Sequence, residues 1–257
     1  MARELRRLLI APERLGGHGS AVVLDTHERH YLSRVLRLRP GDRFAITDGA
    51  GRLWSARLSE AGAELEQPST VPLECQPKPR PALTLVVAMP KRDGEVLARM
   101  AAELGIDAVL PLQAARSSGA ERYRPERLAA ILREAAEQCE RLWLPELQPL
   151  QAADQLFEAP PLGVGLLAST RTKGLPLLDL ALAELGAAQA AAGVTLAVGP
   201  EGGWSPQEDQ TAQAAGWRPV SLGPSILRVS TAAVVGTAAL VRWRLGLTCP
   251  SCSAPSP

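Results

Sequence analysis

Two glycine-containing segments in the last quarter of the chain hold the residues best suited to bind a small molecule. The first reads Val-Gly-Pro-Glu-Gly-Gly-Trp over 198–204, and the second reads Ser-Leu-Gly-Pro-Ser-Ile-Leu-Arg over 221–228. Each follows a short apolar run and precedes a stretch with helical character. Glycine lets the backbone pass close to a ligand and adopt positive φ, so paired loops of this kind predict a cofactor crevice. Tight turns that bind nothing are the alternative explanation for these glycines.

The common phosphate-binding patterns are missing from the sequence. It contains no G-x-x-x-x-G-K-[ST] run and no G-x-G-x-x-G between a strand and a helix. This disfavours a nucleoside triphosphatase and a nicotinamide-dependent dehydrogenase.

The two loops must be positioned by an α/β domain. Apolar runs of strand length occur at 83–88, 106–110, 163–168 and 194–198, and helical patterns separate them. One helix is predicted from a cap at Asp93 to Leu104, with Val96, Leu97, Met100 and Leu104 buried. Others are predicted over 125–142, 177–185 and 231–245. Apolar strands that alternate with helices predict a parallel sheet covered on both faces.

Helix caps fix the end of each loop. Ser205 with Glu208 three positions later is a capping box, and Pro206 suits the first helical position. Ser230 or Thr231 is the predicted cap of the last helix. Both loops are therefore predicted to run from a strand end to a helix start.

The N-terminal part of the chain reads as a separate small β-barrel. Short strands alternate with turns, and the sequence Asp-Gly-Ala-Gly at 48–51 predicts a hairpin. Helical spacing at 30–37 predicts a helix with Leu32, Val35 and Leu36 on its apolar side. The expected boundaries are a barrel over 1–74, a Pro-rich linker over 75–81, an α/β domain over 82–246 and a flexible tail over 247–257.

Positive charge is concentrated near the N-terminus. The net charge of the chain is +1, but residues 1–43 hold nine arginines and five acidic residues. A small basic module on a neutral body is typical of a local nucleic-acid contact, for which Arg34 and Arg37 are the candidates. A solvated arginine-rich face is the alternative.

Cysteine usage and hydropathy argue for the cytoplasm. No secretory signal or disulfide framework is apparent. Cys249 and Cys252 have metal-ligand spacing, but no second pair accompanies them, so no metal site is expected. The longest apolar stretch, 231–241, is shorter than the roughly 20 residues of a membrane span, and no membrane association is expected.

The two loops resemble the signature of the RsmE family of ribosomal RNA methyltransferases, which belong to the SPOUT class. The matching residues are Gly199–Ser205, Leu222-Gly223, Ile226–Arg228 and Thr231-Ala232. The resemblance extends to 30–42 and to Arg116 and Glu137, and it covers nearly everything except the tail. It implies a trefoil-knotted α/β domain, a PUA-like N-terminal domain, S-adenosylmethionine as cofactor, a homodimer, and methylation of uridine N3 in 16S rRNA.

The resemblance also implies the residues of the site. Those implied to contact the cofactor are Leu167, Gly199, Pro200, Glu201, Gly202, Gly203, Leu222, Gly223, Ile226, Leu227, Arg228, Thr231 and Ala232. Those implied to be catalytic are Arg116, Glu201 and Arg228, and Arg116 is also a candidate RNA contact.

Three positions depart from the family pattern. Ser225 stands where the family usually has arginine, and Val229-Ser230 replace a Thr-Glu pair. Ser230 would be an adequate substitute if that glutamate only caps the helix. An RNA-binding or ribosome-assembly protein with an inactive cofactor site is the alternative that these departures keep open.

Methyl transfer to a uridine makes two demands on the protein. The methyl group must lie in line with the attacking nitrogen, and the imide must lose its proton. Glu201 could accept that proton, or it could only brace its own loop. Arg116 and Arg228 could hold a phosphate or a uracil carbonyl, or they could form intramolecular ion pairs.

Overall fold

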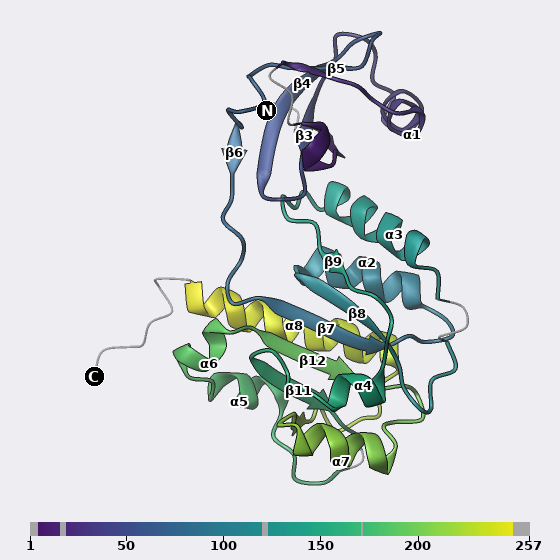
Figure 1. The fold of residues 1–257 in the computed structure, drawn as a ribbon, viewed down its shortest axis with the longest axis vertical. Helices are drawn as coiled ribbons and strands as arrows, with labels where there is room; N and C mark the ends of the chain where they lie inside the picture. The colour runs from purple at the N-terminus through teal and green to yellow at the C-terminus, as the bar shows by residue number, and fades with distance from the viewer. Residues whose placement is uncertain (1–4, 16–18, 120–122, 171, 249–257) are drawn as a thin grey trace. The chain divides into compact units, whose positions relative to one another are not determined.

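The structure, a computed structural model, describes residues 5–15, 19–119, 123–170 and 172–248. It divides into two compact units (Figure 1). The first comprises residues 1–78 together with 133–144, and the second comprises 79–132 and 145–257. No helix in the described residues is long and apolar enough to cross a membrane. Cys249 and Cys252 lie outside the described residues.

The first unit is built on a six-stranded sheet with the order β1-β3-β4-β5-β2, in which β6 also pairs with β4. Its elements are β1 (Arg7–Leu9), η1 (Pro12–Arg14), β2 (Ala21–Val22), α1 (Thr26–His30), η2 (Tyr31–Val35), β3 (Arg43–Thr47), β4 (Arg52–Leu58), β5 (Ala63–Leu65) and β6 (Glu74–Cys75). The predicted hairpin is confirmed, because β3 and β4 pair antiparallel up to Thr47 opposite Leu53. Asp48 organises the turn by accepting hydrogen bonds from the amides of Ala50 and Arg52.

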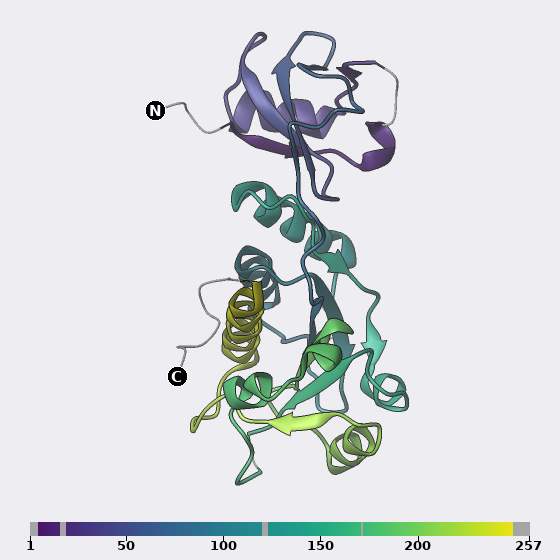
Figure 2. The ribbon, with the colours of Figure 1, turned by 90° about the vertical axis from the view of Figure 1, so that its left-hand side faces the viewer.

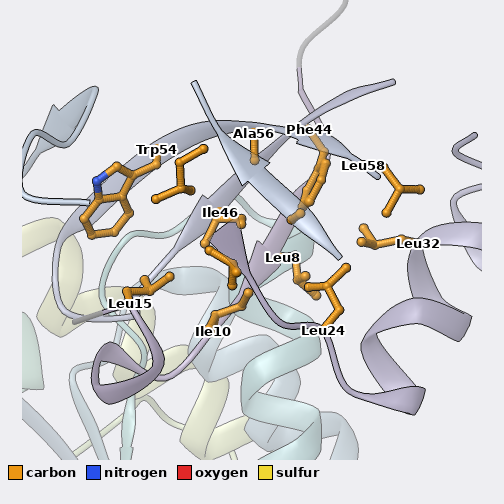
Figure 3. Close-up of a cluster of buried hydrophobic side chains, with 13 residues drawn as sticks. Leu8, Ile10, Leu15, Leu24, Leu32, Phe44, Ile46, Trp54, Ala56 and Leu58 are labelled. Carbon is orange, nitrogen blue, oxygen red and sulfur yellow. The ribbon is translucent and has the colours of Figure 1, made fainter. Parts of the chain in front are cut away.

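The larger of two apolar clusters fills the interior of this unit, and a smaller one is formed by Ala45, Leu53 and Leu142. Phe44, Ile46 and Trp54 point into it from the two hairpin strands, and Leu32 closes it from η2 (Figure 3). The helix predicted over 30–37 is present as α1 followed by a π-turn, closed by the bond from Leu36 N to Tyr31 O at 2.9 Å. Val35, which is on the predicted apolar side with the buried Leu32, is 59% exposed. The i→i+5 turn rotates the side chains around it away from the directions that a regular helix with 3.6 residues per turn would give them.

Residues 133–144, which lie far along the sequence, complete the first unit. Glu137 accepts a hydrogen bond from the amide of Leu9 at 2.8 Å, and Arg133 donates to the carbonyl of Leu9 at 2.8 Å. The Trp143 ring packs directly against Gly51, so that a Cβ on Gly51 would lie 2.7 Å from the ring. Burial raises the pKa of the Glu137 carboxyl, and the hydrogen bond from Leu9 opposes this shift. The sequence-based division placed this segment wholly in the α/β domain.

The second unit is a seven-stranded, wholly parallel sheet with the order β10-β8-β7-β12-β11-β13, in which β9 also pairs with β8. Its strands are β7 (Leu83–Ala88), β8 (Ala108–Gln113), β9 (Glu146–Leu147), β10 (Gln151–Ala152), β11 (Val164–Ala168), β12 (Val194–Val198) and β13 (Arg218–Val220). The helices are α2 (Gly94–Leu104), α4 (Ala153–Phe157), α5 (Leu178–Ala183), α6 (Ala187–Ala191), α7 (Pro206–Ala214) and α8 (Val229–Thr248), and α3 (Pro125–Gln138) belongs to this unit up to residue 132. The predicted parallel α/β architecture is confirmed.

Helices cover both faces of this sheet. The helices α2 and α8 lie on one face, and α4 and α7 lie on the other (Figure 2). Alternation along β7 sends Val86 and Ala88 into the apolar cluster under α4 and α7. The α2–α8 contact is close because α2 presents Ala98, Ala101 and Ala102 on its buried side.

The predicted buried stripe of α2 was largely wrong. Leu97 is buried as expected, but Val96, Met100 and Leu104 are 44%, 36% and 37% exposed. Hydrophobicity alone predicts that the larger side chains of α2 face the core. In the structure, the close contact between α2 and α8 buries the small alanine side chains instead. At the end of α2, Arg244 of α8 donates to the carbonyl of Gly105 at 2.8 Å.

Candidate functional site

One cavity of about 340 Å³ lies at the carboxyl ends of the strands in the second unit. Its lining comes from three loops: the loop after β12, the loop after β13, and the loop after β11. Arg116, from the loop after β8, adds a cationic side chain. In parallel α/β sheets this edge is where ligands bind, and the volume is within the range of small-molecule sites.

The structure brings most of the predicted cofactor-binding residues together around this cavity. Ten of them line it: Gly199, Pro200, Glu201, Gly202, Gly203, Leu222, Gly223, Ile226, Leu227 and Ala232. Leu167 does not, because it is fully buried in β11 beneath the lining residue Ala168. Arg228 and Thr231 are exposed at the start of α8 and are not part of the lining.

The first loop, 199–204, is anchored by Trp204. The indole Nε1 donates to the carbonyl of Ala168 at 3.0 Å, which ties this loop to the end of β11. The ring stacks edge-on against Phe157 with centroids 5.3 Å apart. A Cβ on Gly199 would lie 2.8 Å from the Trp204 ring, so this position has room only for glycine. Gly199 is thus required for close packing within the loop.

Arg116 also braces the first loop. Its Nη1 donates to the carbonyls of Gly202 and Trp204, at 3.0 and 3.2 Å. A Cβ on Gly202 would come within 3.1 Å of the Arg116 side chain. Arg116 therefore makes hydrogen bonds to backbone carbonyls and does not form the intramolecular ion pair that was the alternative. No carboxylate among the described residues pairs with its positive charge.

Glu208 joins the loop after β8 to the first loop. Its two carboxylate oxygens accept from the amides of Ala115 and Ser205, both at 2.7 Å. The predicted capping box is confirmed, because the Ser205 side chain also accepts from the amide of Glu208. Glu208 is 7% exposed, so both bonds are shielded from water. The sequence pattern predicts Glu208 only as part of a helix start. In the structure, Glu208 also holds the backbone next to Arg116 in place.

Glu201 is exposed at the cavity, and no hydrogen bond or ion pair of its side chain occurs among the described residues. The bracing of the loop is carried by Arg116, Trp204 and Glu208 instead. The carboxylate of Glu201 is therefore available to a ligand.

The second loop runs from β13 to α8. Ser221 Oγ accepts from the amide of Gly223 at 3.2 Å, and Gly223 has φ +132°, a conformation that favours glycine. The amide of Ser221 donates to the carbonyl of Pro176, and the amide of Leu178 donates to Ser221, at 2.8 and 2.9 Å. The second loop thus lies directly against the segment that leads out of the loop after β11.

The predicted cap of the last helix was wrong. The helix α8 begins at Val229, and the amide of Ala232 bonds to the carbonyl of Arg228 at 2.8 Å. Ser230 and Thr231 are therefore inside the first turn. Val229 is buried and lines the cavity, and Ser225 also lines it. Ser230 does not occupy the capping position that would make it a substitute for a capping glutamate.

The sequence analysis missed the third wall of the cavity. Ala168, Ser169, Thr170 and Thr172 supply it, and Asp209 of α7 also lines the cavity. This segment contains no glycine, so the signal that revealed the other two loops is missing. Its position follows from the strand order, because β11 lies between β12 and β13.

The RNA-binding candidates of the first unit are free of ion pairs. Arg34 and Arg37 are exposed, and neither takes part in a salt bridge among the described residues. By contrast, five arginines of this unit are paired with carboxylates: Arg7, Arg14, Arg43, Arg52 and Arg57. Unpaired positive charge of this unit therefore lies on η2 and on the turn that follows it.

The sequence matches two protein families. Residues 76–241 match an RNA methyltransferase domain, and residues 24–65 match an RNA methyltransferase PUA domain. A ribosomal RNA small subunit methyltransferase E from Synechocystis is 40% identical over 236 residues, which cover 90% of this chain and 76% of that protein. The chain belongs to this family.

Other members of the methyltransferase E family agree with this assignment. The Mycobacterium bovis enzyme is 32% identical over 91% of this chain and 90% of its own length. The crystal structure of the Neisseria gonorrhoeae enzyme, bound to S-adenosyl methionine, has a TM-score of 0.76 and 28% identity, over 92% of this chain and 97% of that one. The expected fold, a SPOUT methyltransferase domain with a PUA-like domain before it, is confirmed.

Proposed function

We propose that this chain methylates N3 of a uridine in 16S rRNA, with S-adenosylmethionine as methyl donor. The observation that carries the proposal is the cavity that loops 199–204 and 221–228 form together, in a fold whose Neisseria gonorrhoeae relative is bound to S-adenosyl methionine. The relatives are named as small subunit rRNA methyltransferases.

The residues present fit this cofactor. Glycines of both loops line the cavity, where only backbone can meet a ligand, and Leu222, Ile226 and Leu227 give it apolar surface. This mixture of apolar walls and a few polar groups is typical of cofactor sites. S-adenosylmethionine supplies an electrophilic methyl group.

Three residues of the protein are proposed to act on the substrate RNA. Glu201 is the proposed acceptor of the N3 proton, because its carboxylate is at the cavity and makes no hydrogen bond or ion pair with the residues that the structure describes. Arg116 is held against the first loop and presents positive charge beside the cavity, which would stabilise charge on a uracil carbonyl oxygen. Arg228, exposed where α8 begins, is proposed to hold a phosphate of the RNA.

The PUA-like unit is proposed to hold the RNA through Arg34 and Arg37, which are exposed and form no salt bridge with any described residue. The proposal also includes a homodimer and a cytoplasmic location, where ribosomal subunits are assembled. A dimer is tested by light scattering at micromolar concentration, and a monomer would contradict it.

The alternative is an RNA-binding assembly protein with an inactive cofactor site. The departures at Ser225 and Val229 favour it, because both line the cavity. The catalytic proposal is better supported, since the cavity is open and the bracing of the first loop is complete. Titration with S-adenosylmethionine separates the two, and no binding at millimolar cofactor would favour the inactive protein.

The decisive experiment maps methylated nucleosides in 16S rRNA by mass spectrometry, from cells with and without this protein. We expect one 3-methyluridine to disappear with the gene and to return with the wild-type copy but not with Glu201→Gln. A methylation pattern that is identical in both strains would refute the function.

A further inference from the structure

A second hollow of about 370 Å³ lies in the methyltransferase unit and is lined by basic side chains. Its walls come from the loop after β7 with the start of α2, and from the segment that leads into α3. Lys91 and Arg92 come from the first segment, and Arg124 and Arg127 come from the second. Among the described residues, the lining thus contains four basic side chains and two acidic ones, Asp93 and Glu95.

The charge of this hollow is only partly neutralised. Arg127 and Glu95 form an ion pair at 3.3 Å, and both side chains are 57% exposed. Such exposed pairs contribute little and are easily exchanged for another partner. Lys91 and Arg92 are exposed, and no ion pair of either occurs among the described residues. The hollow therefore presents guanidinium and ammonium groups that an anion can reach.

One loop, the loop after β8, contributes to both this basic hollow and the cofactor cavity. Arg116 lines the cavity, and Gly119 lines the hollow. Three residues of chain span at most about 11 Å between Cα atoms. A Cβ on Gly119 would lie 2.2 Å from the carbonyl oxygen of Met89, so the loops after β7 and β8 are in backbone contact there. The two hollows are therefore fixed next to each other at the same edge of the sheet.

We infer that the hollow lined by Lys91, Arg92, Arg124 and Arg127 binds a phosphate of the substrate RNA next to the methylated nucleotide. The inference rests on the proposed function, because it takes RNA as the substrate of the neighbouring cavity. Arginine and lysine groups that converge on a hollow match the charge and geometry of a phosphodiester. Tyr123 also lines the hollow, half-buried, where a base of a single strand could stack on it.

The test compares two double variants of the full-length protein. Lys91→Gln with Arg92→Gln removes charge from the hollow, and Arg99→Gln with Arg218→Gln removes equal charge from exposed positions that do not line it. Binding of an rRNA fragment that contains the target site is measured against salt concentration. Each phosphate contact that is lost should flatten the slope of log K against log salt by about 0.7.

We expect the hollow variant to bind RNA about ten-fold more weakly, with a flatter salt dependence, a raised KM for RNA and an unchanged Kd for S-adenosylmethionine. The single variant Arg127→Gln should show the same effect at a smaller size. Equal RNA affinity and salt slope in the hollow and control variants would overturn the inference. So would a defect seen only with assembled subunits, because that would indicate a ribosomal protein as the partner. Failure of the proposed function would appear separately, as wild-type protein that methylates no RNA.

Discussion

The carboxylate of Glu208 accepts a hydrogen bond from the amide of Ala115 at 2.7 Å, although 93 residues separate them in the chain. With its other oxygen it accepts from the amide of Ser205. One buried side chain thus sets the distance between the loop that carries Arg116 and the loop that carries Glu201. The cofactor cavity depends on a residue that does not line it.

The variant Glu208→Gln is expected to lose one of these two bonds, since an amide offers one acceptor oxygen in place of two. Leaving a buried amide unpaired costs about 1–3 kcal/mol. We expect a lower urea midpoint and weaker S-adenosylmethionine binding, measured by calorimetry. Glu184→Gln, at an exposed helix end, is the control and should change neither quantity. Unchanged cofactor affinity in Glu208→Gln would show that the loop spacing does not matter.

The variant Gly199→Ala places a methyl carbon 2.8 Å from the Trp204 ring, so the ring must move. We expect a loss of cofactor affinity of at least ten-fold, with a smaller loss of stability. Gly246→Ala is the matched control, because a Cβ there meets nothing within 4 Å and the position is helical. That control should be stabilised by roughly 0.5–1 kcal/mol.

Two tryptophans offer a direct test of the link between the first loop and β11. Trp204 and Trp217 both stack edge-on against Phe157, with centroids 5.3 and 5.4 Å away. Trp204 Nε1 donates to Ala168, whereas Trp217 Nε1 has no hydrogen-bond partner in the described residues. Trp204→Phe should therefore weaken S-adenosylmethionine binding, and Trp217→Phe should leave it unchanged. Equal effects would indicate that the aromatic packing, and not the hydrogen bond, holds the loop.

Glu137 gives the first unit a predictable pH dependence. Because burial raises its pKa above the ordinary value of 4.5, the folded state holds this proton more tightly than the unfolded state does. The stabilisation is present below pH 4.5 and is lost as pH rises through the raised folded pKa. Glu137→Gln keeps an acceptor for Leu9 and should be more stable than wild type near pH 7, by thermal melts from pH 4 to 8. Glu13→Gln, which is exposed, should follow the wild-type curve.

The unpaired arginines of the PUA-like unit should matter more for RNA than the paired ones. Arg34→Gln with Arg37→Gln is expected to weaken rRNA binding and to flatten its salt dependence, with cofactor affinity intact. Arg57→Gln is the control, because Glu66 already neutralises that side chain at 3.1 Å. A loss of RNA and cofactor affinity together would identify η2 as a structural surface.

Local sequence signals predicted the frame of the site well. Glycine pairs and the Ser205 capping box located the first loop between a strand end and a helix start, because these features depend on a few neighbouring residues. The strand 194–198 was predicted with its observed bounds for the same reason. These signals do not report which strands become neighbours.

The misses concern long-range packing. The wall at 168–172 follows from the place of β11 in the sheet, and the exposed face of α2 follows from its close contact with α8. The start of α8 at Val229 follows from how the second loop enters the helix. Ser230 and Thr231 had suggested a later cap. None of these depends on a local pattern.

The contribution of residues 133–144 to the first unit has a consequence for synthesis. A nascent chain that has released only its first 78 residues still lacks Glu137 for the amide of Leu9 and Trp143 for the turn at Gly51. Domains generally fold as they emerge, with the N-terminal one first. Here the N-terminal unit must wait for 55 or more further residues of translation, because its last piece is encoded after β7 and β8. The first unit therefore stays incomplete on the ribosome until residues 133–144 have been translated.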